Sequence, residues 1–588
     1  MKKVMSLVMA AMVMGGLVAG CGNKEEKKPN SSTDNKGDTS STEDKKDEGP
    51  ITFYETGSKT KTLNPHMYET TAESTEMGKM YGNLLEMVVN EEGDDYELIP
   101  NHAASRPTVS DDNLTWTFEI RDGVTWSDGT PITAETYEYS YKMQLDSKLK
   151  NYRGRVLFSD VEIVNAEKYY NGECEWEDVG IKVDGNKLIF TLAFPVPQMD
   201  FEIMFVGGGA TSPVKEDLYE SCFNEDRTEN TYGTSLETTA SSGSYTLVDW
   251  VRDQSMVYEK NEKYPLADYY TPDRIEVRVV EEDATRLTLF ENGDTDYVSV
   301  RGSNYDKYAE DPRMIFSESN SVTYMFINQT SETNPILGNL DFRQALFYGM
   351  NREMIAKDVY KTNIPAPYYI STFKFVKPGV AYRDTDVAKS MVAPENGYNT
   401  EKAKEHFEKA YAANGNNQIA IEMTYFDTSE SMKQMAELLE EEYEGLFGAD
   451  KLDVKLVAVP WNTAYDNMEN GKYDVAFGGW SGGTFNPWSS LEVYTSDYPG
   501  KLDKFYNEEF DQLFHDTVKG DLIFKEEERI KALGRMEQLL FENMPFVPIY
   551  QTRGAFLFSE RVKLKTDGKY LPGVKFGVYQ AEITKQVK

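Results

Sequence analysis

The sequence predicts an α/β fold of several domains, and three observations support this prediction. The chain has 588 residues, which at roughly 150 residues per domain corresponds to about three or four domains. Hydrophobic residues make up 39% of the chain, with 38 Tyr, 29 Phe and 7 Trp, a supply sufficient for packed cores. Between residues 419 and 480, apolar segments with the periods of strands and of helices alternate, as they do in parallel sheets.

These alternating segments are expected to form a β-α-β-α-β unit. Two predicted strands, Ile419–Phe426 and Leu452–Val459, flank a predicted amphipathic helix from Ser431 to Phe447. A shorter helix, Thr463–Asn470, leads to a third strand, Tyr473–Phe477. Such units build parallel sheets with right-handed crossovers, and their ligands bind beyond the carboxyl ends of the strands. The segment that follows the third strand is therefore the first candidate for a binding site.

Strands and turns are also predicted nearer the start of the folded part, which is expected to begin near Pro50. Residues Leu114–Ile120 alternate with the period of a strand, Arg121-Asp122-Gly123 is typical of a turn, and Thr133 is placed to begin a helix. Further strands are expected at Tyr245–Val248 and Ser255–Glu259, which would form a hairpin, and at Arg274–Val280.

The first 20 residues have the pattern of a signal peptide. Lys2 and Lys3 precede an apolar stretch that is too short to span a membrane, and small residues follow it. The run Val18-Ala19-Gly20-Cys21 resembles a bacterial lipobox, which implies cleavage after Gly20 and lipidation of Cys21. We therefore expect a protein anchored by lipid at the outer face of the cytoplasmic membrane. The alternative is an ordinary secreted protein that is cleaved near the same place.

Residues 21–49 are expected to be a disordered linker behind the lipidated cysteine. The segment Gly22–Gly49 contains no Ala, Val, Ile, Leu, Met, Phe, Trp, Tyr or Cys. A mixed-charge stretch without apolar residues cannot bury surface, so it behaves as a flexible tether. No later apolar run approaches the length of a membrane span, which argues against a permease.

The composition excludes several classes of function. The chain has 62 basic and 99 acidic residues, a formal net charge of −37, whereas nucleic-acid binding relies on a basic surface. The four His do not stand at metal-ligand spacing, and no GxxxxGK[ST] phosphate loop is present. We therefore expect no nucleic acid, no metal and no cofactor. Cys174 and Cys222 lie far apart in the sequence and could form a disulfide or remain two thiols.

The segment after the third predicted strand is rich in glycine and aromatic residues. It reads Gly478-Gly479-Trp480-Ser481-Gly482-Gly483-Thr484-Phe485-Asn486-Pro487-Trp488. Glycines let another backbone approach closely, and Trp rings provide flat contact area, which together suit an extended ligand. A glycine-rich loop that crosses the core with its Trp residues buried is the alternative interpretation.

The run from Leu114 to Glu135, with Trp126-Ser127-Asp128-Gly129-Thr130-Pro131 at its centre, is similar to a signature of one family. This family comprises the bacterial extracellular solute-binding proteins of family 5, which deliver peptides to ABC importers, and the oligopeptide-binding branch is the most similar. The resemblance covers about residues 50–570 in family order. Further matching segments are Thr62–Pro65, Ser242–Leu247, Glu291–Asp296, Asp341–Leu346, Gly471–Val475 and Met544–Tyr550.

The resemblance implies a periplasmic-binding-protein type II-like clamp of two lobes with an extra third domain. Lobe I is expected to be discontinuous, from residues 50–80, 206–318 and 531–588, with the extra domain at 81–205 and lobe II at 319–530. Family members capture an oligopeptide between the lobes by hinge closure and deliver it to an ABC permease that a separate ATPase drives. The resemblance thus implies a monomeric binding subunit that is not an enzyme.

The resemblance also assigns candidate ligand contacts. Thr70 and Thr71 lie where the family offers a short edge strand to the peptide, and Gly479, Trp480 and Ser481 lie where the opposite lobe offers the second. Tyr152, Arg155 and Tyr324 lie where relatives have pocket residues, although a surface or core role is as compatible with the sequence. The full set of candidates is Thr70, Thr71, Tyr152, Tyr324, Phe477, Gly479, Trp480, Ser481, Gly482, Gly483 and Phe485.

Three charged anchors of relatives are absent. Gly483 stands where peptide-binding relatives place an Asp for the α-ammonium of the ligand, Phe477 where some place an Arg, and Phe326 where an acidic residue can stand. A buried terminus without a partner costs several kcal/mol. Longer, blocked or cyclic peptides, or a non-peptide solute, are therefore expected in place of a free dipeptide or tripeptide.

The sequence is also compatible with two alternatives to an importer subunit. Gly479-Trp480-Ser481-Gly482-Gly483 fits the G-x-S-x-G pattern of serine hydrolases, with His515 as the only downstream histidine. However, Pro487 follows where a nucleophile elbow needs a helix, and His515 is expected inside a helix, Glu508–Val518. The second alternative is a binder or sensor of a non-peptide solute that works without a transporter.

Overall fold

The computed structural model describes residues 49–159, 161–391, 393–498 and 500–585. Cys21, the predicted signal peptide and the linker up to residue 48 lie outside the described residues. The chain from Pro50 to Lys588 forms one compact unit. None of the helices in the described part of the chain is both long enough and apolar enough to cross a membrane.

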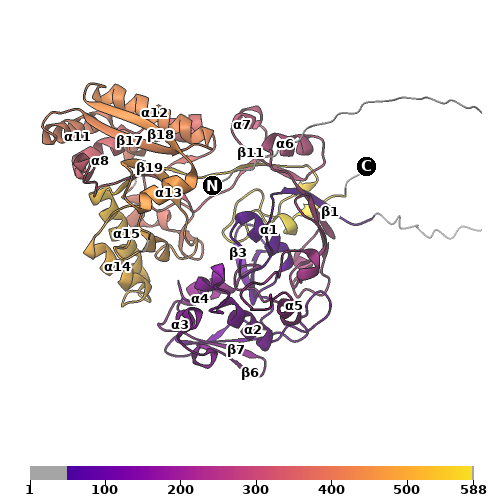
Figure 1. The fold of residues 1–588 in the computed structure, drawn as a ribbon. Coiled ribbons are helices and arrows are strands. Elements are labelled where there is room, and N and C mark those ends of the chain that lie inside the picture. Colours follow the sequence, from indigo (N-terminus) through magenta and orange to yellow (C-terminus); the bar gives the residue numbers. More distant parts are fainter. Residues whose placement is uncertain (1–48, 160, 392, 499, 586–588) are drawn as a thin grey trace, which may run out of the picture. The chain divides into compact units, whose positions relative to one another are not determined.

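A six-stranded mixed sheet forms the centre of the C-terminal half (Figure 1). Its parallel part confirms the predicted β-α-β-α-β unit, because β17 pairs in parallel with both β18 and β19. Helices α12 and α13 connect these strands, and α12 packs against β17 and β18. The strand order is β14 (Ile364–Pro365), β20 (Phe546–Gln551), β13 (Val322–Ile327), β19 (Val475–Trp480), β17 (Ile419–Phe426) and β18 (Leu452–Val459), with α12 at Glu430–Phe447 and α13 at Trp461–Glu469.

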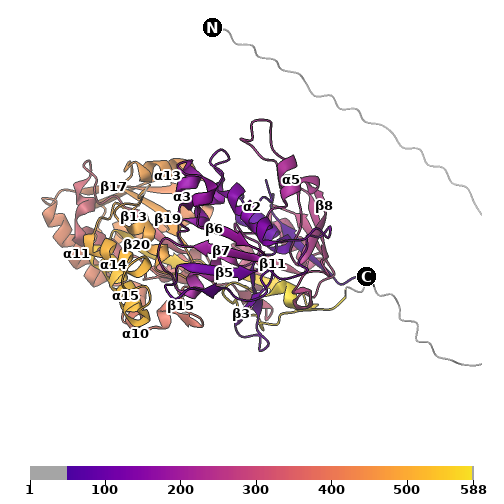
Figure 2. The same ribbon diagram turned by 90° about the horizontal axis from the view of Figure 1, so that it is seen from below.

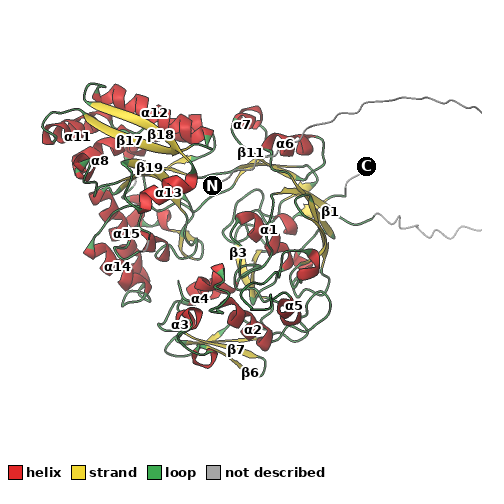
Figure 3. Ribbon diagram, viewed as in Figure 1, coloured by secondary structure: helices red, strands yellow, loops and turns green. Residues whose placement is uncertain are grey.

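Both faces of this sheet are covered, because side chains alternate along each strand. Met325 and Phe477 point into one apolar cluster with α8 (Leu340–Gly349), α11 (Thr400–Ala413) and α12. Tyr324 and Phe326 point into the other cluster. Helices α14 and α15, drawn in red in Figure 3, contribute residues to that cluster as well. The last two helices span Glu508–Val518, as the sequence predicts for α14, and Glu526–Asn543.

A second group of strands is built from distant segments of the chain. Strand β1 (Thr52–Gly57) pairs in parallel with β10 (Arg274–Val279), and β8 (Tyr245–Val251) and β9 (Ser255–Lys260) form the predicted hairpin beside them. A three-stranded sheet places β21 between two strands from the middle of the chain. Its members are β11 (Tyr297–Val300), β21 (Ala555–Phe558) and β12 (Met314–Phe316).

A four-stranded antiparallel sheet lies inside the predicted extra domain (Figure 2). Its strand β5 (Thr115–Glu119) matches the prediction, and α2 packs on β6 and β7. Thr133 begins α2 by accepting a hydrogen bond from the Thr136 amide, so the predicted helix start is confirmed. The other members are β4 (Thr108–Val109), β6 (Ile181–Asp184), β7 (Lys187–Thr191) and α2 (Ala134–Gln144).

Two adjacent connections join the three-stranded sheet to the six-stranded sheet. Residues 317–321 lead from β12 to β13, and residues 552–554 lead from β20 back to β21. The two connections are hydrogen-bonded to each other, from the Ser317 amide to Gly554 O at 2.9 Å and from the Thr552 amide to Ser321 O at 3.3 Å. Paired crossings of this kind can act as a hinge between two sheets.

One predicted domain boundary differs from the structure. Residues 531–551 were expected in lobe I, but β20 is a central strand of the six-stranded sheet and α15 packs on one face of that sheet. The sequence match at Met544–Tyr550 does not reveal which sheet this strand joins, because an apolar strand fits either one. The other domain limits stay predictions.

The remaining elements are short or connect the sheets. They are α1 (Thr71–Met80), β2 (Leu85–Val89), β3 (Tyr96–Pro100), α3 (Ala166–Asn171), α4 (Gln198–Glu202), α5 (Glu216–Ser221), α6 (Asp283–Glu291), α7 (Ser303–Tyr308), α9 (Arg352–Met354), β15 (Phe375–Lys377), β16 (Val380–Ala381), α10 (Asp386–Lys389), β22 (Val562–Lys563) and β23 (Glu582–Ile583).

Candidate ligand-binding site

The carboxyl end of β19 has an edge that no strand of the described residues covers. On one side, β19 pairs with β13 along its whole length, from Val475 to Trp480. On the other side, β17 pairs only with Val475 and Ala476. The edge from Phe477 to Trp480 is therefore open on the β17 side. An open edge of backbone donors and acceptors can take an added strand.

The glycine-rich loop after β19 is held in place by side chains from elsewhere in the chain. Asn320 donates its amide to Gly482 O at 2.8 Å and to Thr484 Oγ1 at 2.9 Å. The Lys374 ammonium donates to the carbonyl oxygens of Ser481 and Gly483, the latter at 3.0 Å. The backbone amide of Phe375 also donates to Thr484 O at 2.9 Å. Together these five hydrogen bonds from Asn320, Lys374 and Phe375 fix the path of the loop.

Lys374 is an unusual clamp because it is buried among carbonyl oxygens. Its side chain is 4% exposed, and this burial lowers its pKa from the ordinary value to about 7. A neutral amine still has two N–H groups, so it can serve both carbonyls after it loses a proton. Lys374 therefore holds the loop in either protonation state.

Trp480 ends β19 and lies beside a small cavity. Its indole nitrogen donates to Ser490 O at 2.9 Å, which fixes the ring, and the residue is still 37% exposed. The adjacent cavity of about 110 Å³ is lined by Gly479, by the aromatic residues Phe326, Tyr465, Tyr494 and Tyr498, and by Glu469. A fixed, exposed aromatic ring next to an open strand edge is suited to contact an extended ligand.

Thr70 and Thr71 differ from the short edge strand that the resemblance implies. Thr70 has an extended backbone, but Thr71 is the first residue of α1, and Thr70 is its N-cap. The buried Glu73 carboxylate accepts the amides of Glu69 and Thr70, each at 2.9 Å. Burial raises the pKa of Glu73, but these backbone hydrogen bonds outweigh it and hold the pKa below its ordinary value. The amide of Thr70 therefore already donates to Glu73 within the capping box, and it is not free to pair with a peptide.

Replacing Thr70 by alanine is expected to destabilise the protein by about 1 kcal/mol, because the N-cap acceptor is lost. Thr70→Ser should retain the stability of the wild type. Thr71→Ala is the matched control, since Thr71 is exposed and does not cap the helix. Urea unfolding measures all three. Unchanged stability in Thr70→Ala together with lost ligand binding would contradict the capping role and favour a direct ligand contact.

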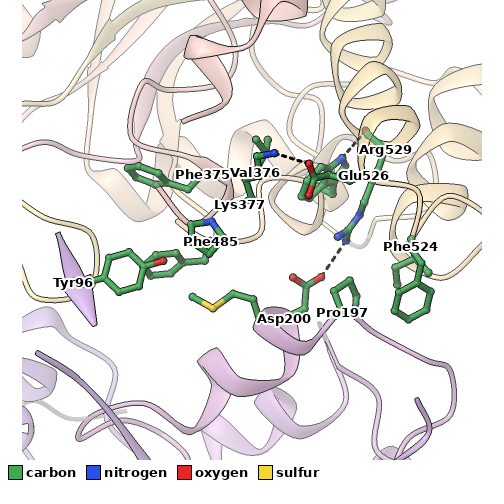
Figure 4. Close-up of a pocket in the computed structure, with 14 residues that line it drawn as sticks. Tyr96, Pro197, Asp200, Phe375, Val376, Lys377, Phe485, Phe524, Glu526 and Arg529 are labelled. Atoms are coloured by element: carbon green, nitrogen blue, oxygen red, sulfur yellow. Dashed lines mark hydrogen bonds and ion pairs between the residues drawn. The ribbon is translucent and has the colours of Figure 1, made fainter. Parts of the chain in front are cut away.

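Phe485 lies at the far end of the loop, in a cavity of about 240 Å³ (Figure 4). Its ring contacts Tyr96 at 5.3 Å and Phe375 at 6.3 Å between centroids. In the same cavity wall, Arg529 forms a buried ion pair with Asp200 at 3.1 Å. Burial raises the pKa of the Asp200 carboxyl, and Arg529 opposes that shift. The cavity is lined both by residues of the predicted extra domain, Tyr96 and Asp200, and by residues of the C-terminal half, such as Arg529.

The other predicted contacts divide between core and surface. Tyr324 and Phe477 are buried in the two apolar clusters of the sheet, and the Tyr324 hydroxyl donates to Tyr369 O at 2.6 Å. Tyr152 is exposed and lies 5.0 Å from the Arg153 guanidinium. Tyr324 and Phe477 thus belong to the core, and Tyr152 lies at the surface. Side chains of β13 and β19 alternate between the two faces of the sheet, and both faces are buried. A strand that is apolar on both faces is the sequence signal that could have placed Tyr324 and Phe477 in the core.

Several residues that shape the site were not identified from the sequence. Lys374, Asn320 and the Asp200–Arg529 pair come from distant segments, so their meeting depends on the tertiary fold. Lys374 does carry a local signal, because it interrupts the apolar run from Phe373 to Val376. A charged residue inside such a run is commonly paired or functional.

The geometry does not support the serine hydrolase alternative. The loop after Ser481 leads to a 3₁₀ helix, Ser489–Tyr494, in place of the long helix that follows a nucleophile elbow. His515 lies on α14 with its Nδ1 at 3.5 Å from the neighbouring Asp516. Within the described residues, no hydrogen bond joins Ser481 to His515.

Cys174 and Cys222 are not bonded to each other, which selects the two-thiol alternative.

Comparison with curated proteins identifies relatives over most of the chain. The chain is 26% identical over 476 residues to the dipeptide-binding protein DppE of Bacillus subtilis, covering 80% of this chain and 82% of that protein. It is 25% identical over 503 residues to the periplasmic oligopeptide-binding protein OppA of Escherichia coli, covering 84% and 86% respectively.

Solved structures share the fold. Listeria monocytogenes OppA bound to peptide aligns with a TM-score of 0.68 at 21% identity, over 92% of this chain and 100% of that one. The substrate-binding domain of an oligopeptide ABC transporter from Bacillus anthracis aligns with a TM-score of 0.68 at 22% identity, over 91% and 100%. The predicted type II periplasmic-binding-protein fold is thereby confirmed. Because the family model for the bacterial extracellular solute-binding proteins, family 5, matches residues 97–501, the chain belongs to that family.

Proposed function

We propose that this chain is the substrate-binding subunit of an ABC importer that captures oligopeptides outside the cytoplasmic membrane. The observation that carries this proposal is the open edge of β19 from Phe477 to Trp480. A peptide that adds to this edge forms main-chain hydrogen bonds whatever its side chains are, so affinity comes with little sequence preference. The curated relatives that bind dipeptides and oligopeptides support the same class of ligand.

The ligand is an oligopeptide whose amino terminus is not fixed by a carboxylate at the loop. Gly483 offers no side chain where the resemblance places an Asp, and its carbonyl accepts a hydrogen bond from Lys374. A partly charged lysine at this point disfavours an α-ammonium group, because like charges repel. Longer peptides, or peptides with a blocked or cyclic backbone, therefore suit the site better than free dipeptides.

Delivery requires motion and partners. The paired connections at residues 317–321 and 552–554 supply the hinge about which the two groups of sheets close on a peptide. The closed form is then recognised by a membrane permease, with a separate ATPase as the source of energy. Lipidation at Cys21 keeps the protein near that permease, and it acts as a monomer.

Native mass spectrometry of the unit from Pro50 to Lys588 tests the proposal. Co-purified masses that correspond to mixed peptides are the expected result, and so is stabilisation of the refolded protein by a peptide library. A single non-peptide mass, or no retained mass and no stabilisation by any peptide, would contradict the peptide assignment. Mixed dipeptides alone would contradict the preference for longer chains. Peptide masses that shorten during incubation with the protein would favour the serine hydrolase alternative. In that case Ser481→Ala should abolish the shortening.

A further inference from the structure

The predicted extra domain and the first group of strands share one hydrophobic core. Phe53 of β1 and Tyr258 of β9 belong to the same buried cluster as Trp116 and Phe118 of β5. The six-stranded sheet has two clusters of its own. Because the side chains of one close-packed core move together, the extra domain and the first group of strands form one body, here called the N-terminal body. The six-stranded sheet and its helices form the C-terminal body.

The turn between α14 and α15 contacts the N-terminal body. Ile523 in this turn is 6% exposed, and it belongs to the buried cluster of the N-terminal body. Lys519, just after α14, pairs with Glu162 of the extra domain at 3.1 Å, and its ammonium lies 4.9 Å from the centre of the Phe194 ring. An apolar side chain of one body that is buried in the core of the other indicates a packed contact. The C-terminal body therefore packs on the extra domain through this turn.

A buried ion pair between Asp200 of α4 and Arg529 of α15 also joins the two bodies. The two side chains are 9% and 6% exposed, and their charged groups are 3.1 Å apart. Arg529 is fixed on its own side, because it donates to Thr517 O at 2.8 Å and its guanidinium lies 3.9 Å from the Trp488 ring. A buried charge that loses its partner is strongly unfavourable. Each body thus carries one charge that the other body neutralises.

Asp200 contacts the end of the glycine-rich loop as well. The Asn486 side-chain amide donates to Asp200 Oδ2 at 3.3 Å. Helix α4 is held on the sheet of the extra domain by the next residue, Phe201, whose ring stacks on Trp116 at 4.5 Å between centroids. One carboxylate therefore connects the extra domain both to α15 and to the loop that follows the open edge of β19 (Figure 4).

We propose that Asp200 is a positioning residue for ligand binding, which holds the two bodies together and fixes the end of the glycine-rich loop without contacting the peptide. The inference rests on the proposed function and assigns a role to the extra domain. When the two bodies separate about the paired connections, Asp200 and Arg529 must separate too. Contacts that exist only in the closed form raise its population, so they slow the release of an enclosed ligand. Association begins in the open form, where this pair is not formed.

The test compares Asp200→Asn with the wild type, each as the unit from Pro50 to Lys588. Stopped-flow fluorescence with a fluorescein-labelled synthetic copy of a co-purified peptide measures association and dissociation separately. Dissociation should be at least about tenfold faster in Asp200→Asn, because Arg529 loses its buried partner, and the association rate constant should change by less than about twofold. A residue that only stabilised its own domain would lower Tm without this difference between the rate constants. Asp184→Asn is the matched control, since Asp184 is an exposed residue of β6 in the same domain.

A double variant separates the ion pair from other effects of the substitution. Arg529→Gln alone should also accelerate dissociation. The double variant Asp200→Asn/Arg529→Gln should release the peptide more slowly than either single variant, because neither body then buries a charge without a partner. Additive acceleration in the double variant would overturn the role of the pair.

The outcomes separate this inference from the proposed function. A wild-type dissociation rate in Asp200→Asn, with peptide binding intact, would overturn the inference and leave the importer assignment in place. No peptide binding by the wild type would contradict the proposed function, and small-angle scattering then tests the inference by itself. Asp200→Asn should have a larger radius of gyration than the wild type, and equal radii would overturn the inference. If Asp200→Asn does not fold, Arg529→Gln is measured in its place.

Discussion

Replacing Trp480 by alanine is expected to weaken peptide binding by about ten- to hundredfold, which corresponds to about 1.4–2.8 kcal/mol. Two effects add in this variant. The exposed indole ring beside the open edge of β19 is lost, and so is the hydrogen bond from its nitrogen to Ser490 O at 2.9 Å, which holds the end of the strand. Titration calorimetry with a peptide found by native mass spectrometry measures the change.

Two further variants identify the cause of this loss. Trp480→Phe retains an aromatic ring without the indole donor, so it should bind with intermediate affinity. Tyr506→Ala is the matched control, since Tyr506 is an exposed aromatic residue of the same half of the chain. Equal affinity of Trp480→Ala and wild type would show that the ligand does not contact the end of β19.

Replacing Lys374 by methionine should weaken binding by at least tenfold and change how stability depends on pH. Binding weakens because the carbonyls of Ser481 and Gly483 lose the side chain that fixes the loop. The pH effect follows from the lysine pKa, which is ordinary at 10.5 in the unfolded chain and about 7 in the folded protein. Between these values the unfolded chain binds more protons, so the stability of the wild type rises with pH.

The Lys374→Met variant lacks this contribution. The difference in the free energy of unfolding, wild type minus variant, should therefore increase by up to about 5 kcal/mol from pH 7 to pH 10.5. Urea unfolding at several pH values measures this difference. Lys377→Met is the matched control, because Lys377 is an exposed lysine that pairs with Glu526 at 2.6 Å. A difference that does not depend on pH would contradict a lowered pKa of Lys374 in the folded protein.

Local patterns were sufficient to predict much of the fold. Period-2 and period-3.6 apolar patterns located β17, α12 and β18 to within a residue, because both faces of that sheet are buried and the pattern is unambiguous. The limits of the lobes rest on the family resemblance instead, which places residues 531–551 in lobe I, whereas β20 lies in the six-stranded sheet. Sheet membership depends on long-range packing, which periodicity does not contain.

The sequence predicted only those parts of the site that follow from a local pattern. Gly479, Trp480 and Ser481 lie at the end of β19 because the third strand of the parallel unit ends there. Lys374 and Asn320, which fix the loop, come from more than 100 residues away, so no local pattern could place them beside it. Thr70 was assigned to the ligand by resemblance, whereas its capping box with Glu73 was visible in the sequence Thr70-Thr71-Ala72-Glu73.

Amide hydrogen exchange across residues 477–481, with and without a bound peptide, tests the central claim most directly. The open edge of β19 should become protected when the peptide pairs with it, because its amides then donate to the peptide main chain. Slower exchange in this segment at saturating peptide is the predicted result. Tight peptide binding with unchanged exchange at residues 477–481 would contradict the account, since the peptide would then be held elsewhere.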